Sequence, residues 1–153
     1  TLVWDRLRRF DPARPVFVES ESRKVGNVAV PDALIERMRA SRCLKLELAD
    51  DQRVALLLED YDFFVQDPAL FCERLDALIE LRGKAVVRGW QEQVMAGQVE
   101  PVVRELLLRH YDPGYAASIA RNFSGYSGAP TIAPVDRSPA AMAQLAQAII
   151  RGI

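Results

Sequence analysis

The sequence contains few of the residues that build metal centres and disulfide frameworks. Its 153 residues include two cysteines and one histidine. Cys43 and Cys72 are too few for a disulfide framework, and neither stands in a Cys-x-x-Cys or other metal-ligand spacing. We therefore expect both to be small buried apolar residues, and we expect no zinc, haem or flavin.

Long apolar runs are also missing. No stretch approaches the roughly 20 apolar residues that a membrane-spanning helix requires, and no charged and then apolar leader follows Thr1. Half of the residues are hydrophobic and 27% are charged, which is usual for globular proteins. These features predict a cytoplasmic protein without a membrane partner, and the length favours one domain with a sizeable core.

The chain has no phosphate-binding loop of the Walker A type. That pattern places a further glycine upstream of its Gly-Lys pair, and for Gly83-Lys84 the required position is occupied by Leu78. No internal repeat is visible either. A nucleotide site, if one exists, would need a glycine-rich loop from outside these residues.

The net charge of −1 gives no global attraction to nucleic acid, but the charges are unevenly spread. Residues 45–80 contain ten acidic and three basic residues, whereas residues 81–153 contain eight basic and five acidic ones. An RNA-binding surface should avoid the first region. Further basic residues lie near the amino terminus, at Arg6, Arg8, Arg9 and Arg14, and between Arg23 and Arg42.

Hydrophobic periodicity predicts a predominantly helical α/β fold, with a partial parallel sheet of two or three short strands followed by a helical subdomain. Strands are expected over Val16–Val18, Cys43–Leu48 and Thr131–Val135. Helices are expected over Leu2–Phe10, from Asp32 through Met38, from an Asp50 or Asp51 cap through Tyr61, in three segments ending at Gly83, Gly97 and His110, from Asp112 to Asn122, and from a Ser138 cap through Ile150. The expected units are an α/β part at residues 1–66, a helical subdomain at 67–123, a linker at 124–137 and a terminal helix at 138–153 that packs back on the α/β part.

A dense polar cluster follows the first expected strand. Val16–Val18 is unbroken by polar residues, which is typical of a strand covered on both faces, and Glu19, Glu21, Arg23 and Lys24 come directly after it. Ligands of open α/β sheets bind beyond the carboxyl ends of the strands. Glu19 or Glu21 is therefore a candidate for a catalytic carboxylate that orients Mg²⁺ or water, and Arg23 and Lys24 are candidates for phosphate binding. The alternative is a solvated strand end with a local ion pair.

Two further residues have a functional and a structural interpretation. Arg53 lies in the first turn of its expected helix, where a cation opposes the helix dipole, so it is a third candidate for phosphate binding. The alternative is a surface arginine paired with Asp50 or Glu47. His110 falls on an apolar helix stripe, which favours a hydrogen-bonded interface histidine over a ligand or base.

Several separated motifs resemble one known family. They are Val-Glu-Ser-Glu-Ser-Arg-Lys-Val-Gly at Val18–Gly26, Val30-Pro31, Gln-Arg-Val-Ala-Leu-Leu-Leu-Glu-Asp-Tyr at Gln52–Tyr61 and His-Tyr-Asp-Pro-Gly-Tyr at His110–Tyr115. In this order, as far as about Phe123, they resemble tRNA 2-selenouridine synthase. The resemblance implies a bacterial transferase with a rhodanese-like and a P-loop domain, of which this chain would be the later part of the P-loop domain alone.

The resemblance also implies a reaction and partners. The wobble 2-thio group of tRNA would be replaced by selenium through an S-geranylated intermediate, with selenophosphate and geranyl diphosphate as co-substrates and Mg²⁺ left open. The partners would be tRNA and the rhodanese-like and Walker A parts of the same protein. The rhodanese-like domain carries the catalytic cysteine of the family, so neither cysteine here inherits its role, and the chain alone is expected to be inactive.

Tyrosines beside cations in the helical half suggest where tRNA would bind, because aromatic rings stack on bases and cations neutralise phosphates. The candidates are Lys84, Arg88, Arg104, Arg109, Tyr115 and Arg121. A core tyrosine and solvated helix faces are the structural alternatives. Two other function classes also remain open: a nucleotide-hydrolysing or kinase-like P-loop domain unconnected with RNA, and a non-catalytic helical interaction module.

Overall fold

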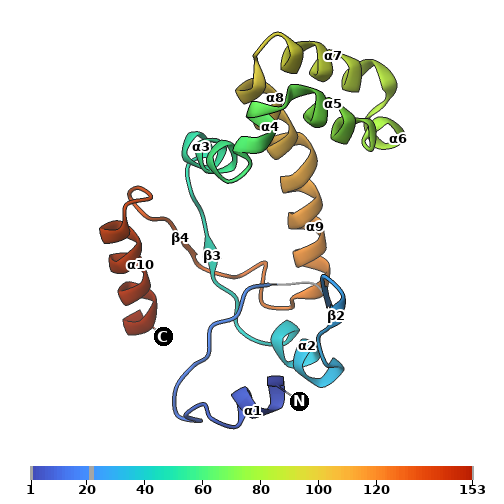
Figure 1. Ribbon diagram of the computed structural model, residues 1–153. Coiled ribbons are helices and arrows are strands. Elements are labelled where there is room, and N and C mark those ends of the chain that lie inside the picture. Colours follow the sequence, from blue (N-terminus) through green and yellow to red (C-terminus); the bar gives the residue numbers. More distant parts are fainter. Residues whose placement is uncertain (1, 21–22, 153) are drawn as a thin grey trace.

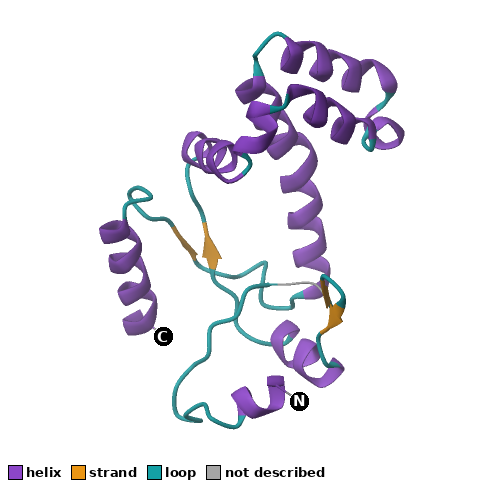
Figure 2. Cartoon of the chain, viewed as in Figure 1, coloured by secondary structure: helices purple, strands orange, loops and turns teal. Residues whose placement is uncertain are grey.

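The computed structural model describes residues 2–20 and 23–152, and it is predominantly helical with a small parallel sheet, as predicted (Figures 1 and 2). In chain order its elements are α1 (Leu2–Leu7), β1 (Lys24–Val25), β2 (Val28–Ala29), α2 (Asp32–Arg39), β3 (Lys45–Leu46), α3 (Asp50–Asp60), α4 (Asp62–Gln66), α5 (Pro68–Asp76), α6 (Ile79–Arg82), α7 (Lys84–Met95), α8 (Val99–Leu106), the π-helical segment η1 (Leu107–Tyr111), α9 (Asp112–Asn122), β4 (Thr131–Ile132) and α10 (Pro139–Gly152).

The main hydrophobic core lies between α5, α7 and α8, which we call the helical unit together with α4 and α6. Its buried side chains recur at helical spacing, so each helix turns one apolar stripe inward. They are Phe71, Leu75, Val87, Trp90, Val94, Val99, Val102 and Leu106. The Asp67 side chain caps α5 by accepting a hydrogen bond from Leu70 N at 3.0 Å, and glycines with positive φ at Gly83 and Gly97 let the chain reverse between helices.

The strands form two separate pairs. β3 and β4 run parallel, with Lys45 opposite Thr131 and Leu46 opposite Ile132, so the prediction of a small parallel sheet is confirmed with two of the three expected strands. β1 and β2 form an antiparallel hairpin around Gly26, whose φ is 57°. This hairpin was not predicted from the sequence.

The expected buried strand over Val16–Val18 is wrong. Residues 15–20 adopt no regular secondary structure, and the three side chains are 48%, 50% and 60% exposed. An apolar triplet becomes a strand only where neighbouring strands accept its backbone hydrogen bonds and cover its faces. The described residues provide no such neighbour, because the two pairs of strands involve other segments.

A long continuous helix replaces the break expected at Asp112-Pro113-Gly114. α8, η1 and α9 follow one another without a turn, and Asp112 has helical φ and ψ of −58° and −48°. The π segment widens the helix just before Pro113, where the ring would otherwise clash with the preceding turn. In Figure 1 this helix runs from the helical unit down to α2 and the β1–β2 hairpin.

The lower part of the molecule is joined at the end of α9. Ser124 N donates to Arg39 O at 3.1 Å, and Phe123 and Ile35 are buried there. A Cβ on Gly125 would lie 3.0 Å from Ser41 O, so only glycine fits without a shift of the α2–β3 connection. No residue of α9 itself is buried, so this helix is an exposed link between the helical unit and α2.

Candidate functional site

The described members of the amino-terminal polar cluster are exposed and lie before or at the start of the β1–β2 hairpin. Glu19 is exposed, and Glu21 lies outside the described residues. Arg23 pairs with Asp32, the first residue of α2, and Lys24 lies in β1. The local ion pair proposed as the structural alternative is therefore present at Arg23. Because both partners are largely exposed, the pair contributes little to stability.

Arg53 has a different carboxylate partner. Its Nη1 donates to Asp112 Oδ2 at 2.8 Å and its Nη2 donates to Asp112 Oδ1 at 2.5 Å, while Asp50 lies at 3.4 Å. The side chains of Arg53 and Asp112 are only 31% and 33% exposed, and hydrogen bonding to Asp112 raises the pKa of Arg53 above its usual value. The expected partner Asp50 is thus a weak second contact. Asp50 and Asp51 lie in the first turn of α3 and, against expectation, do not cap it.

The three predicted phosphate ligands do not meet at one point. Arg53 lies on α3 beside the helical unit, whereas Arg23 and Lys24 lie at the hairpin near α2, in the lower part of the molecule (Figure 1). They were expected together because the end of a strand at Val18 would have gathered them, and that strand is not formed. A phosphate role for either group stays a prediction, but it requires two places rather than one cradle.

A hydrogen-bond network surrounds the π segment. Arg82, at the end of α6, donates from Nε to His110 Nδ1 at 3.1 Å and from Nη2 to Arg109 O at 2.6 Å. His110 therefore makes the hydrogen bonds expected of an interface histidine. Arg109 O is the carbonyl that Pro113, which has no N–H, cannot bond in an α-helical register. Arg82 thus supplies the donor that the proline lacks.

This replacement predicts a measurable coupling between Arg82 and Pro113. Arg82→Ala should lower the free energy of unfolding by about 1 kcal/mol, because the Arg109 carbonyl and His110 Nδ1 lose their donor. Pro113→Ala restores a backbone N–H at that turn, so Arg82→Ala should cost less when introduced into Pro113→Ala. Urea unfolding of the two single variants and the double variant measures the difference, and equal costs in both backgrounds would contradict the account.

The Arg53–Asp112 pair permits a second stability measurement. Arg53→Met and Asp112→Asn should each destabilise the chain, and the double variant should lose less than their sum, with a coupling of about 1 kcal/mol for a bidentate, partly exposed pair. Arg104→Ala is a suitable comparison, because Arg104 is equally shielded but its carboxylate partners, Asp51 at 2.7 Å and Glu100 at 3.1 Å, are largely exposed. Additive costs at Arg53 and Asp112 would show that the pair does not hold α3 to α9.

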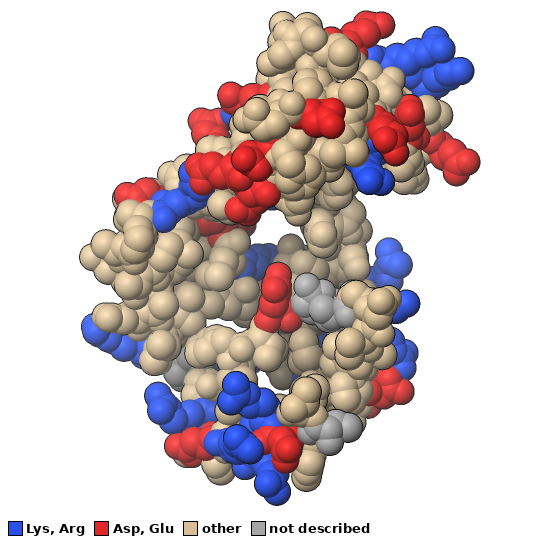
Figure 3. Space-filling model, viewed as in Figure 1, with Lys and Arg blue, Asp and Glu red and all other residues tan. Residues whose placement is uncertain are grey.

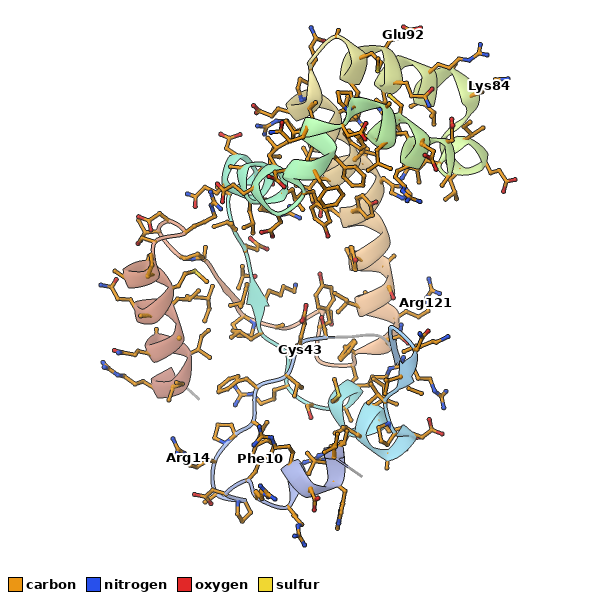
Figure 4. The ribbon with its side chains drawn as sticks, viewed as in Figure 1. Phe10, Arg14, Cys43, Lys84, Glu92 and Arg121 are labelled. Atoms are coloured by element: carbon orange, nitrogen blue, oxygen red, sulfur yellow. The ribbon has the colours of Figure 1, made fainter. Side chains whose placement is uncertain are left out.

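The six predicted tRNA-binding residues are dispersed. Arg104 is paired as above, and Arg109 pairs with Glu105 at 2.9 Å. Tyr115 is exposed, so the structural alternative of a core tyrosine is wrong. Lys84 lies in the helical unit at the top of Figure 4, whereas Arg121 lies at the lower end of α9, near the middle of the view. A tRNA that touches all of these residues would have to extend along the continuous helix from the helical unit to the end of α9.

The cysteines and carboxylates provide no metal centre within the described residues, where no group of three His, Cys, Asp or Glu side chains is close enough to hold a metal ion. A magnesium site at Glu19 therefore has at most one further ligand of these types among the described side chains. Cys43 and Cys72 are half-buried rather than fully buried. Burial raises the pKa of the Cys72 thiol, which keeps it protonated and unreactive at neutral pH.

No helix among residues 2–20 and 23–152 combines the length and the apolar character needed to cross a membrane. The terminal segment is tied to α3 instead: Arg137, just before α10, donates to both carboxylate oxygens of Glu59 at 2.9 and 2.6 Å. Hydrogen bonding to Arg137 lowers the pKa of Glu59. Ser138 caps α10 by accepting from Ala141 N at 3.2 Å, as predicted.

Comparison with known proteins finds that the amino-terminal part of the chain is similar to an AAA domain. Residues 1–70 match the family model described as the tRNA 2-selenouridine synthase AAA domain. The resemblance predicted from the motifs is thereby confirmed for this part of the chain. No solved structure matches.

Two curated relatives share the same name. The chain is 40% identical over 53 residues to the tRNA 2-selenouridine synthase of Marinobacter nauticus, covering 35% of this chain and 14% of the relative. It is 43% identical over 61 residues to that of Cupriavidus necator, covering 39% of this chain and 17% of the relative. The matched segments thus span only about a sixth of either relative.

The family match and the ion pair of Arg53 concern the same segment. Arg53 belongs to the motif Gln52–Tyr61, which lies inside the matched residues 1–70, whereas Asp112 belongs to the motif His110–Tyr115 outside them. Their bidentate pair joins these two distant motifs. Both motifs stand out in the sequence, but the pairing of Arg53 with Asp112 does not, because a contact across 59 residues leaves no local signal.

Proposed function

We propose that the natural protein containing this chain is a tRNA-modifying transferase that converts wobble 2-thiouridine to 2-selenouridine. The observation that supports this proposal most strongly is the match of residues 1–70 to the AAA domain of tRNA 2-selenouridine synthase. The two relatives, at about 40% identity, support it independently. A tRNA substrate and a place in the bacterial cytoplasm belong to the same proposal.

The finer steps follow from the family resemblance. The sulfur of 2-thiouridine would attack the first carbon of geranyl diphosphate, forming a carbon–sulfur bond and releasing diphosphate. The selenium of selenophosphate would then attack the base carbon that bears the geranylated sulfur and expel that sulfur as geranylthiol, and water would cleave the selenium–phosphorus bond and release phosphate. In the first step negative charge accumulates on a departing diphosphate, and cations fixed in place stabilise such charge.

Arg23 and Lys24 are the residues that we assign to that charge. Arg23 is largely exposed despite its pair with Asp32, so it can exchange a carboxylate for a phosphate oxygen without leaving a buried charge behind. Arg53 is the weaker candidate, because a phosphate would have to displace both hydrogen bonds to Asp112. Glu19 or Glu21 would orient water at the same end of the molecule.

The reaction itself distinguishes this proposal from its alternatives. Purified natural protein is incubated with tRNA bearing 2-thiouridine, geranyl diphosphate and selenophosphate, and the nucleosides are analysed by mass spectrometry. We expect S-geranyl-2-thiouridine first and 2-selenouridine afterwards. Nucleotide hydrolysis that does not respond to tRNA, without either nucleoside, would support a P-loop hydrolase or kinase. The absence of both activities would support a non-catalytic interaction module.

A further inference from the structure

Positive charge gathers at the amino-terminal end of the molecule and not in the helical unit. Residues 1–44 contain nine basic and six acidic residues, whereas residues 45–106 contain seven basic and thirteen acidic ones. Figure 3 shows the consequence on one face: blue side chains cluster over α1 and the loop after it, while red side chains dominate the helical unit. A polyanion is therefore attracted to the first region and repelled by the second.

The arginines of this end are available for a ligand. We call residues 2–18, which comprise α1 and the chain up to Val18, the amino-terminal surface. Among the arginines of this surface, only Arg8 forms an ion pair in the described structure, with Asp5 at 3.3 Å. The other carboxylate of the surface, Asp11, accepts a hydrogen bond from Ala13 N at 2.9 Å. Arg6, Arg9 and Arg14 form no ion pair in the described structure and are exposed. In the helical unit, by contrast, Arg82 and Arg104 are already engaged.

Aromatic side chains are interleaved with these arginines and are exposed as well. Trp4 is 64% exposed, and Phe10 and Phe17 are 45% and 50% exposed. Figure 4 shows Phe10 and Arg14 on the loop that follows α1. Backbone hydrogen bonds from Arg9 N to Arg6 O and from Arg14 N to Asp11 O, both 3.1 Å, fold this loop into successive turns. The aromatic rings are thus presented to solvent from a defined backbone.

We propose that the amino-terminal surface binds single-stranded RNA, with Arg6, Arg9 and Arg14 on phosphates and Trp4, Phe10 and Phe17 on bases. Unpaired cations beside exposed rings are the combination that binds unpaired nucleotides, because rings stack on bases and cations neutralise the backbone. A purely apolar protein partner would leave the arginines unpaired. The inference rests on the proposed function and identifies the surface that receives the unpaired bases of the anticodon loop.

The proposed contacts between arginines and phosphates are tested by the salt dependence of tRNA binding. The double variant Arg9→Ala, Arg14→Ala changes two exposed side chains outside α1, so the fold should be unaffected. Removal of one arginine–phosphate interaction with a single strand should flatten the plot of log affinity against log salt by about 0.7. Arg74→Ala, Arg151→Ala is the matched control: it removes the same charge from exposed positions elsewhere and should keep the parent slope.

Stacking is tested by fluorescence, because the chain has two tryptophans in opposite environments. Trp4 is 64% exposed and Trp90 is 4% exposed. An anticodon stem-loop RNA should quench the emission of Trp4, and a fully paired RNA hairpin of equal length should quench it far less. In Trp4→Phe the quenching should disappear while the Trp90 emission stays constant. Trp4→Ala should weaken binding by about fivefold or more.

The outcomes separate this inference from the proposed function. If the parent binds tRNA, but the arginine variant keeps its slope and Trp4 emission does not change, the amino-terminal surface is overturned as an RNA site and the tRNA binds elsewhere. That surface would then contact protein instead, while the proposed function stands. If the parent binds no tRNA under any salt condition, both the inference and the proposed function fail.

Discussion

Arg23→Ala in the natural protein should reduce turnover at least tenfold, which corresponds to about 1.4 kcal/mol of lost transition-state stabilisation. Arg23 is exposed and, within the described structure, forms its ion pair with the exposed Asp32, so the loss would reflect the missing charge on a phosphate and not a loosened fold. The rate is measured separately for geranylation and for selenation. A change in the maximal rate of one step would show which phosphate compound Arg23 contacts.

Asp32→Ala is the matched control for this prediction. It breaks the same ion pair but leaves the Arg23 cation in place, so activity should be kept. If Arg23 acts only by holding α2 through Asp32, the two variants should lose activity equally. Unchanged kinetics of Arg23→Ala in both steps would remove Arg23 from the reaction altogether.

Trp90→Ala should lower the free energy of unfolding by about 3 to 5 kcal/mol. Trp90 lies at the centre of the helical unit, where it packs in the cluster formed by α5, α7 and α8. Removing the indole leaves a cavity between helices that pack mainly through apolar side chains, with hydrogen bonds from Gln91 of α7 to Cys72 O at 2.9 Å and to Asp76 at 3.0 Å on α5. The loss is measured by urea unfolding followed by circular dichroism.

Leu81→Ala provides the comparison for Trp90→Ala. Leu81 is an apolar residue of the same unit but is 72% exposed, so its removal should change stability by less than about 0.5 kcal/mol. A loss below about 1 kcal/mol at Trp90 would show that the cluster does not carry the stability of the helical unit. Equal losses at both positions would contradict the core as described.

The helices could be predicted from the sequence because their signals are local. The apolar stripes of α5, α7 and α8 recur at helical spacing, and Gly83 and Gly97 end helices where a positive φ is needed. Strands depend on partners that the sequence does not specify. The segment of β3 was predicted from alternation, whereas the more apolar Val16–Val18 has no neighbouring strand to pair with among the described residues.

The candidate site was predicted less well, for the same physical reason. Arg53 was identified by its unfavourable place in the first turn of α3, but its partner Asp112 lies 59 residues away. The expected break at Pro113 failed because Arg82, from another helix, bonds the carbonyl that the proline leaves free. Tertiary hydrogen bonds of this kind override a local proline signal, and composition alone cannot reveal them.

The most direct test of the central claim is the nucleoside content of tRNA in cells. The gene of the natural protein is expressed in bacteria that lack their own 2-selenouridine synthase but make selenophosphate, and tRNA is digested and analysed by mass spectrometry. The account predicts that 2-selenouridine appears, and that the Arg23→Ala variant produces at least tenfold less at equal protein levels. If the tRNA of cells that express the intact, folded protein contains 2-thiouridine but no 2-selenouridine, the proposed function is contradicted.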